Sequence, residues 1–307
     1  MRVLVLGSTG QLGREVVKQG KDRPYKIIKA TRRDFDLLED PEVIEEKMYE
    51  LMQYTHPRVV VNCAAHTDVR GSEEHPDKAY QANMDGMRAV AVGFKRYAML
   101  SSSLSPIFMH TSTDYVYNSL IDVHIGEKTC MAENPLNVYG RSKLMFDSYL
   151  RCFMNMESMV IRTSGLFSKH GNNIYNKIVH ADKQLTFVGD GYNIPTSTMF
   201  VARVIWLFVD HYIKNNIQIV SYPLVHAVAS MGDAAPSWYE FAEEVLKVAG
   251  LSTPLLKTTH AEMCAKTGVK VSQRSVVAHS FDDVCHTATE GLIVPTWKEC
   301  IKEVFNS

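Results

Sequence analysis

The chain has 307 residues, of which 46 % are apolar and 22 % charged, and its formal net charge at pH 7 is −1. This composition is ordinary for a globular protein, and a near-neutral chain without long lysine or arginine runs is not expected to bind nucleic acid or an anionic membrane. The longest apolar stretch, 199–209, contains Arg203 and ends before Asp210, so it is too short and too charged to span a bilayer.

The six cysteines are scattered through the chain without C-x-x-C spacing. In a chain of this length, that distribution indicates reduced thiols rather than a disulfide framework or a zinc site. We therefore expect a cytoplasmic protein and predict no metal site.

Strand-like and helix-like segments alternate through the first 165 residues. Short continuous apolar runs are typical of buried parallel strands, and apolar residues three and four apart are typical of helices. The expected strands are 2–7, 25–31, 58–65, 106–117 and 158–167. A first helix is expected after the turn that begins at Gly7, and further helices are expected at 40–54, 75–100 and 139–155. This order predicts an α/β fold with a doubly wound, Rossmann-like parallel sheet that binds ligands at the carboxyl ends of its strands.

The pattern is less regular in the second half of the chain. The clearest signal is a helix that begins after Ser237, where Glu240 completes a capping box. We expect residues 1–165 to form a dinucleotide-binding domain, to which the chain returns around 199–228. Residues 166–307 would form mainly a smaller C-terminal α/β substrate-binding lobe. Three tryptophans at helical spacing are expected in the core, namely Trp206, Trp238 and Trp297.

Gly7, Gly10 and Gly13 form a G-x-x-G-x-x-G turn between the first strand and the first helix. Glycines let the backbone turn sharply and approach a diphosphate closely, and the helix N-terminus offers unpaired N–H groups to it. A purely structural turn is the alternative. The position of the turn at the start of a βα series favours the dinucleotide interpretation.

The end of the second strand bears on the choice between NAD and NADP. Arg32 and Arg33 follow it where an acidic residue would bind a ribose 2′-hydroxyl. Arginine favours a 2′-phosphate through charge-assisted hydrogen bonds, so NADPH is the expected cofactor and NADH the alternative. Solvated surface arginines would look the same in the sequence. Asp36 and Leu37 are placed to border the adenine.

Polar residues gather where the fourth strand ends and the next helix begins. Thr113, Asp114 and Tyr115 follow the strand, and Tyr139 and Lys143 lie one helical turn apart in the segment "YGRSK". A nearby ammonium lowers the pKa of a phenol, whereas burial raises it. We expect Thr113 to hold a substrate carbonyl oxygen while Tyr139 protonates it, with the ammonium and a cationic nicotinamide together outweighing burial. A surface pair is the alternative for Tyr139 and Lys143.

The motifs "GSTGQLG", "NCAAHT", "STDYVY", "NVYGRSK", "IRTSGLF" and "NIPTS" occur in the order found in extended short-chain dehydrogenases/reductases. The chain most resembles the dTDP-4-dehydrorhamnose reductase family, and the likeness covers most of its length. The resemblance implies NADPH-dependent reduction of the 4-keto group of a nucleotide-linked 6-deoxy sugar. It implies a catalytic set of Thr113, Tyr139 and Lys143, with substrate contacts at Thr113, Asp114 and Tyr115.

The resemblance also implies a set of cofactor contacts from several loops. They are Gly7, Thr9, Gly10, Gln11, Leu12, Gly13, Ala64, Ala65, Asn83, Tyr139 and Lys143, and they join the contacts already expected at Arg32, Arg33, Asp36 and Leu37. The resemblance is compatible with assembly into a homodimer.

Two positions depart from the family pattern. The family usually has tryptophan where this chain has Gly165, and its late Arg-Pro pair is Arg274–Ser275 here. These departures bear on the identity of the sugar. The alternatives are a nucleotide-sugar epimerase/reductase, a dehydratase, or a non-catalytic NADP-binding subunit that resembles the regulatory subunit of methionine adenosyltransferase.

Overall fold

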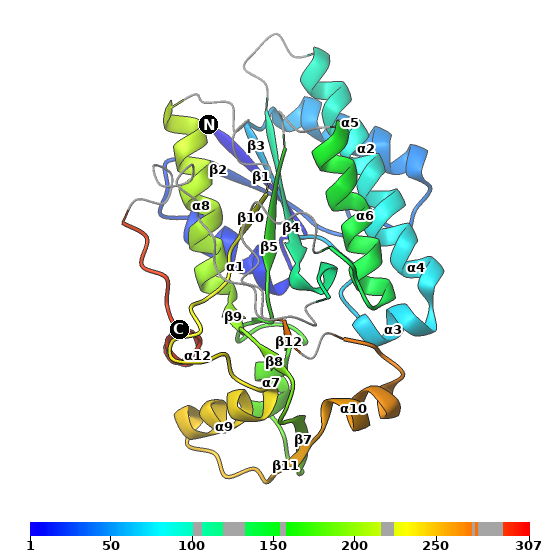
Figure 1. Ribbon diagram of the computed structural model, residues 1–307. Helices are drawn as coiled ribbons and strands as arrows, with labels where there is room; N and C mark the ends of the chain where they lie inside the picture. The colour runs from blue at the N-terminus through cyan, green and yellow to red at the C-terminus, as the bar shows by residue number, and fades with distance from the viewer. Residues whose placement is uncertain (101–105, 119–132, 154–157, 216–223, 272–273, 276–290) are drawn as a thin grey trace.

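The computed structural model describes residues 1–100, 106–118, 133–153, 158–215, 224–271, 274–275 and 291–307. Its centre is a six-stranded parallel sheet in the order β2-β1-β3-β4-β5-β10 (Figure 1). The strands are β1 (Arg2–Leu6), β2 (Lys26–Ala30), β3 (Val59–Asn62), β4 (Ile107–Thr113), β5 (Ser158–Thr163) and β10 (Leu224–His226). The predicted α/β, doubly wound fold class is confirmed.

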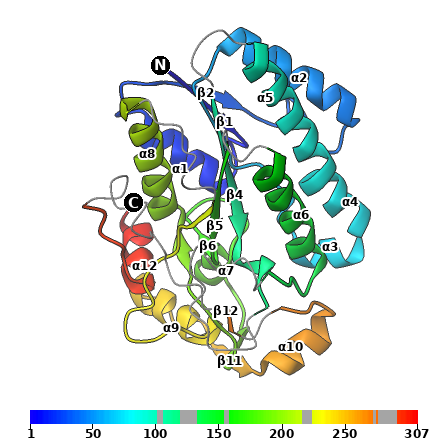
Figure 2. The same cartoon turned by 45° about the horizontal axis from the view of Figure 1, so that its top comes forward.

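Helices cover both faces of the sheet (Figures 1 and 2). One face carries α1 (Gln11–Gly20) and α8 (Thr198–Asn215), and the other carries α2 (Pro41–Thr55), α5 (Met87–Leu100) and α6 (Val138–Phe153). Side chains of a strand alternate between faces. Accordingly, Val3 and Val5 pack in the core with Trp206, whereas Leu4 and Leu6 pack in the core with Phe94. Each such large side chain contributes about 1.5–3 kcal/mol when fully buried.

The strand order reverses direction around β1. The chain passes from β1 to its neighbour β2 and then returns to β3 on the other side of β1. Loops that follow β1 and β3 therefore diverge to opposite faces, and ligands of such sheets bind in the crevice between them. Here the two loops touch at their start, because a Cβ built on Gly7 would lie 2.7 Å from the backbone nitrogen of Ala64.

The single helix expected at 75–100 is interrupted. After α3 (Val69–Glu74), the chain forms α4 (Pro76–Tyr80), a π-helical turn η1 (Gln81–Gly86) and α5. The turn contains Asn83, whose Nδ2 donates to the carbonyl of His66 at 2.9 Å and to Ser142 Oγ at 3.1 Å. Its Oδ1 accepts from the backbone nitrogen of His66 at 2.8 Å. These tertiary bonds hold a π-turn that hydrophobic spacing does not reveal.

The remaining elements lie at one end of the sheet (Figure 1). They are η2 (Asp114–Val116), β6 (Leu166–Phe167), α7 (Ile174–Val179), β7 (Leu185–Val188), β8 (Tyr192–Asn193), β9 (Thr196–Ser197), α9 (Trp238–Ala249), β11 (Leu255–Thr258), α10 (His260–Thr267), β12 (Arg274–Ser275) and α12 (Trp297–Asn306). Three two-stranded sheets join β7 to β11, β8 to β12 and β6 to β9. The division of the chain into two domains near residue 165 stays a prediction.

Several local expectations have definite outcomes. The capping box of Ser237 and Glu240 is present at the start of α9. Trp206 and Trp297 are buried as expected. The strand expected at 158–167 is broken by Ser164 and by Gly165, which has a φ of +49°. Within the described ranges, no helix is long and apolar enough to cross a membrane, and no group of three or more potential metal ligands is gathered.

Candidate active site

The glycine loop after β1 is shaped by backbone contacts. Gly7 has a φ of +69°, a conformation that side chains disfavour. A Cβ on Gly13 would overlap the carbonyl of Gly7, so the first turn of α1 packs directly on the loop. At Gly10, by contrast, a Cβ would meet only the Gly7 oxygen, at 3.3 Å, among the described residues. Protein backbone therefore packs against the loop at Gly7 and Gly13, whereas the side of the loop at Gly10 is open.

This open side fits an anionic ligand. Gly10 is the N-cap of α1 and offers no side-chain cap, so the first N–H groups of the helix stay available to a phosphate. Gln11 connects the loop to the second half of the chain, because its Oε1 accepts from Asn173 Nδ2 at 3.2 Å. Thr9 is exposed beside this opening, whereas Leu12 is buried and packs into the core.

The residues after β2 lie at the surface. Arg32 is 84 % exposed, and its Nε lies 3.6 Å from Asp36 Oδ2, while Arg33 is also exposed. Such an exposed ion pair has little stability of its own, so the Arg32 side chain is free to bind a ligand phosphate instead. Leu37 is half-buried, and its carbonyl lies where a Cβ of Gly86 would be.

Hydrogen bonds from two asparagine side chains fix the loop after β3. Ala64 donates its backbone N–H to Asn62 Oδ1 at 3.0 Å, and Ala65 next to it is half-buried. Asn83 is 1 % exposed and holds His66 by two hydrogen bonds. The structure thus gives Asn83 a supporting contact to this loop and places Ala64 beside Gly7.

The proposed catalytic side chains meet where β4 ends and α6 begins. A Cβ on Gly140 would overlap the carbonyl of Tyr115, so the segment "YGRSK" needs glycine at its second position for this close approach. The rings of Tyr115 and Tyr139 contact edge to face, with centroids 5.7 Å apart. Thr113 hydrogen-bonds the phenol of Tyr139. The structure therefore brings Thr113, Tyr115 and Tyr139 together as predicted from the sequence.

The charge state of Tyr139 in the protein alone is decided by its burial. Burial raises the pKa of the Tyr139 phenol, and Asp114 and Asp147 raise it further, while the hydrogen bond from Thr113 lowers it. The Lys143 ammonium is not among the groups that offset the burial. Among the protein's own groups burial therefore dominates, and the phenol keeps its proton at neutral pH. The expectation also invoked the nicotinamide charge, so it stays a prediction for the protein with bound cofactor. A protonated phenol is the form that a proton donor requires.

Lys143 lies on the same face of α6 as Tyr139 but reaches past it to β4. Its Nζ lies 2.9 Å from the Thr111 carbonyl oxygen and 3.0 Å from His110 Nε2. The residue is only 2 % exposed. Burial lowers the pKa of the Lys143 amine to about 8, against the opposite influence of Asp147. A surface pair, the simplest alternative for Tyr139 and Lys143, is excluded by this burial.

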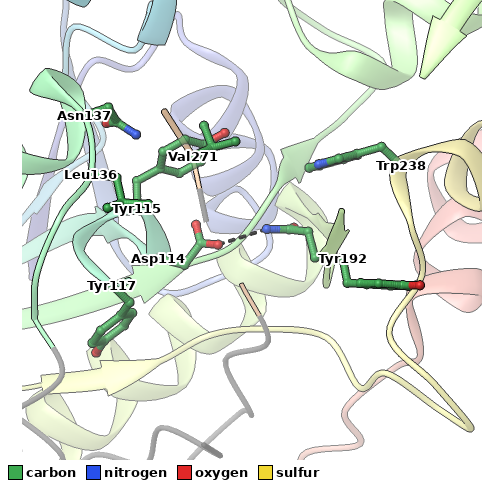
Figure 3. A pocket seen from close by; sticks show the side chains of 9 residues that line it. Asp114, Tyr115, Tyr117, Leu136, Asn137, Tyr192, Trp238 and Val271 are labelled. Atoms are coloured by element: carbon green, nitrogen blue, oxygen red, sulfur yellow. Dashed lines mark hydrogen bonds between the residues drawn. The ribbon is translucent and has the colours of Figure 1, made fainter. Parts of the chain in front are cut away.

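A pocket lies between the end of β4 and the second half of the chain (Figure 3), and its lining includes Tyr115, whose ring contacts Tyr139. Asp114 forms part of its floor, and its Oδ2 accepts from Asn193 Nδ2 and from Ser164 Oγ, each at 3.0 Å. Asp114 and Tyr115 thus lie where substrate contacts are expected. The lining residues are Asp114, Tyr115, Tyr117, Leu136, Asn137, Tyr192, Asn193, Trp238 and Val271.

Trp238 corrects one sequence prediction. It is only half-buried and lines the pocket, opposite Tyr115, rather than lying in the core (Figure 3). Its indole lies against Gly165, where a Cβ would come within 3.1 Å of Trp238 Cη2. Helical spacing places a side chain on one face of α9 but does not distinguish a core from a pocket wall. Tyr192 and Asn137 are further lining residues that the sequence did not single out.

The fold and this site define an NAD(P)-dependent oxidoreductase of the extended short-chain dehydrogenase/reductase type. The family model described as "RmlD substrate binding domain" matches residues 1–307. The chain therefore belongs to that family.

Individual relatives agree with this assignment. The spore coat polysaccharide biosynthesis protein SpsK of Bacillus subtilis is 28 % identical and covers 98 % of this chain and 96 % of its own length. The dTDP-4-dehydrorhamnose reductase of Escherichia coli K12 is 26 % identical over 100 % of this chain and 97 % of its own. A dTDP-4-dehydrorhamnose reductase structure from Clostridium acetobutylicum superposes with a TM-score of 0.82, at 28 % identity, covering 100 % and 99 % of the two chains.

More distant structures share the fold. A dTDP-4-dehydrorhamnose reductase of Bacillus anthracis in complex with NADP has a TM-score of 0.79 at 24 % identity, covering 99 % and 98 % of the two chains. A UDP-glucose 4-epimerase of Thermus thermophilus in complex with NAD has a TM-score of 0.76 at 16 % identity, covering 100 % and 98 %. These two likenesses show that the fold is shared.

Proposed function

We propose that the protein reduces the 4-keto group of a nucleotide-linked 6-deoxy sugar with NADPH. The observation that carries the proposal is the buried, hydrogen-bonded pair of Thr113 and Tyr139, which contacts the pocket through Tyr115. Such pockets at the carboxyl ends of a doubly wound sheet are where its ligands bind. Relatives named dTDP-4-dehydrorhamnose reductase favour this substrate class.

The cofactor would be held by the loops that surround the switch point. The open front of Gly10 and the N-terminus of α1 fit its diphosphate, and Arg32 and Arg33 are placed to bind a 2′-phosphate. When bound, the nicotinamide supplies the hydride for the reduction.

The chain's own residues would position the keto group and protonate it. The Tyr139 phenol is protonated and hydrogen-bonded to Thr113, so both hydroxyls can converge on one carbonyl oxygen. Transfer of the phenolic proton neutralises the alkoxide that forms at that oxygen. Asp114, fixed by Asn193 and Ser164, offers a carboxylate to sugar hydroxyls. Trp238 presents an apolar indole to a face of the sugar ring.

The test is NADPH oxidation by the purified protein with a panel of dTDP- and UDP-linked 4-keto-6-deoxy sugars. We expect turnover with at least one dTDP-linked member, and NADH as a poorer reductant. Tight NADPH binding without reduction of any sugar in the panel would contradict the proposal and favour a non-catalytic NADP-binding subunit. Interconversion of sugar epimers without net NADPH oxidation would favour the epimerase alternative.

A further inference from the structure

A chain of hydrogen bonds runs through the sheet behind the active site. The backbone N–H of Ala64 donates to Asn62 Oδ1 at 3.0 Å, and Asn62 Nδ2 lies 2.8 Å from His110 Nδ1. His110 Nε2 lies 3.0 Å from Lys143 Nζ, which donates to the Thr111 carbonyl at 2.9 Å. The chain thus begins at a backbone donor and ends at a backbone acceptor, and three buried side chains lie between them.

The two backbone ends fix the direction of every bond. The Ala64 N–H can only donate, so the Asn62 amide must turn its oxygen toward Ala64 and its NH₂ group toward His110. His110 Nδ1 is then an acceptor. The ring is neutral, because burial and the nearby Arg162 guanidinium lower the pKa of His110 well below its ordinary value. A neutral imidazole carries one proton, which must therefore be on Nε2, the atom that faces Lys143.

This tautomer bears on the charge of Lys143. An ammonium group has three donors and no lone pair, so it would point N–H toward the N–H of His110 at 3.0 Å. A neutral amine accepts the His110 proton with its lone pair and still donates to Thr111. We propose that His110 is a positioning residue that favours the neutral amine of Lys143 in the protein without nucleotide, so that in mildly alkaline solution Lys143 takes up one proton when the anionic nucleotide binds.

The structure also provides a place for the His110 proton after that uptake. Asp147 Oδ1 lies 3.7 Å from His110 Nε2 and is buried without a hydrogen-bond partner among the described residues. When a proton from solvent binds the Lys143 lone pair, the His110 N–H can turn from Nζ to this oxygen. The bond to Lys143 is exchanged for a bond to Asp147, so no buried donor is left unpaired.

The charged and titratable groups around this pair come from every neighbouring element. They are Asp147 on α6, Arg162 on β5, Cys63 after β3 and Tyr139 at the start of α6. Asp147 favours the ammonium, but Arg162 already engages Asp147 Oδ2 at 3.0 Å and draws on its charge. Burial lowers the pKa of Lys143 to about 8, in the same direction as the His110 contact.

The first test needs no variant and no turnover. Long-range proton–nitrogen NMR spectra of the nucleotide-free protein distinguish the two imidazole tautomers at pH 7. The His110 signals are assigned by their loss in His110→Phe. We expect the Nε2–H tautomer with an unprotonated Nδ1. A proton on Nδ1 would reverse the hydrogen-bond chain and overturn the proposal.

The second test follows the Lys143 side chain with pH. Carbon-13 signals of the lysine Cε, assigned with Lys143→Met, should titrate with a midpoint of about 8. His110→Phe removes the donor that favours the amine, so the midpoint should rise by about half to one pH unit. His226→Phe is the matched control, because it replaces another fully buried histidine of the same sheet, which contacts Tyr117 rather than Lys143. A lower midpoint in His110→Phe would show that His110 favours the ammonium, against the proposal.

The third test measures the linked proton and rests on the proposed function. Calorimetric titration with NADPH at pH 9, in buffers of different ionisation enthalpy, reports protons taken up on binding. We expect uptake approaching one proton per nucleotide, and less in His110→Phe at the same pH. NADPH binding without proton uptake would overturn the linkage. Absence of NADPH binding would instead contradict the proposed function, while the tautomer and the lysine titration still decide the state of Lys143.

Discussion

The two halves of the active site use different groups of the protein: one uses the backbone and the other uses side chains. Around β1 the site is backbone: Gly7 and Gly13 leave no room for a Cβ, and Gly10 faces open space. Around β4 and α6 it is side chain: Thr113, Tyr139 and Lys143 are each less than 10 % exposed and hydrogen-bonded.

This difference suits what each half must do. A diphosphate carries its own charge and needs only N–H groups and room, which a glycine loop provides. A proton transfer needs groups whose pKa values are set by burial and neighbours, so it requires buried side chains. Changes in the two halves should therefore affect different measurements. Changes around β1 should alter nucleotide affinity, and changes at Thr113 and Tyr139 should alter the rate, whereas changes at Lys143 should affect both.

The largest effect is expected at Tyr139. Tyr139→Phe removes the proton donor but leaves the ring and its contact with Tyr115, so kcat should fall by about 10²- to 10⁴-fold while NADPH affinity stays unchanged. Steady-state kinetics and NADPH fluorescence titration measure the two quantities. Tyr175→Phe, a buried tyrosine in the other half of the chain, is the control and should keep its kcat. Turnover by Tyr139→Phe at the wild-type rate would show that the Tyr139 phenol does not set the rate, and the proposed division of roles between the two halves would be wrong.

The second comparison sets Gly10→Val against Gly13→Ala. Gly10 has a φ of −70° and a ψ of 169°, which any residue adopts, so valine should leave folding intact and occupy the space for the diphosphate. Gly13→Ala places a Cβ against the Gly7 carbonyl and should lower the free energy of unfolding by about 1–3 kcal/mol. Urea denaturation and NADPH titration separate the two outcomes. Unchanged NADPH affinity in a folded Gly10→Val protein is incompatible with the proposed diphosphate site.

A smaller effect is expected from Arg32→Ala combined with Arg33→Ala. Loss of charge-assisted hydrogen bonds to a 2′-phosphate should weaken NADPH binding about tenfold or more and leave NADH binding nearly unchanged. Both side chains are exposed, so the melting temperature should stay the same. Lys18→Ala and Lys21→Ala remove two cations on or just beyond α1 and serve as the control for net charge. Equal losses of affinity for the two nucleotides would show that the arginines do not read the 2′-phosphate.

The smallest effect is expected at Trp238. Trp238→Leu removes an aromatic face from the pocket, which should raise the KM for the sugar about two- to tenfold without changing NADPH affinity. The half-buried position should limit the loss of stability. Trp297→Leu, at a buried position outside the pocket, is the matched control and should lower stability with little change in KM. A large change in NADPH affinity in Trp238→Leu would mean that the two halves are not separable.

The sequence predicted the parts of the site that depend on local pattern. The glycine loop, the doubly wound parallel sheet and the neighbouring Tyr139 and Lys143 follow from short-range spacing and from the βα series. The pocket walls did not follow, because Tyr192, Trp238 and Val271 come from segments that meet only in the folded chain. The raised pKa of Tyr139 in the protein alone did not follow either, because the sequence does not show that Lys143 reaches toward His110 and leaves burial dominant.

The π-turn at Asn83 has a consequence for how this helix can change. A π-turn holds one residue more than an α-helical turn, so it resembles an insertion that the helix has absorbed. Deleting one residue from Gln81–Gly86 would make the helix regular, and it would also rotate α4 relative to α5 by about 100°. That rotation would turn the buried Ala79 away from its present packing and move the amide away from His66. In this stretch the helix with the π-turn is more stable than a regular helix one residue shorter. The number of residues in it therefore cannot change by even one without loss of packing.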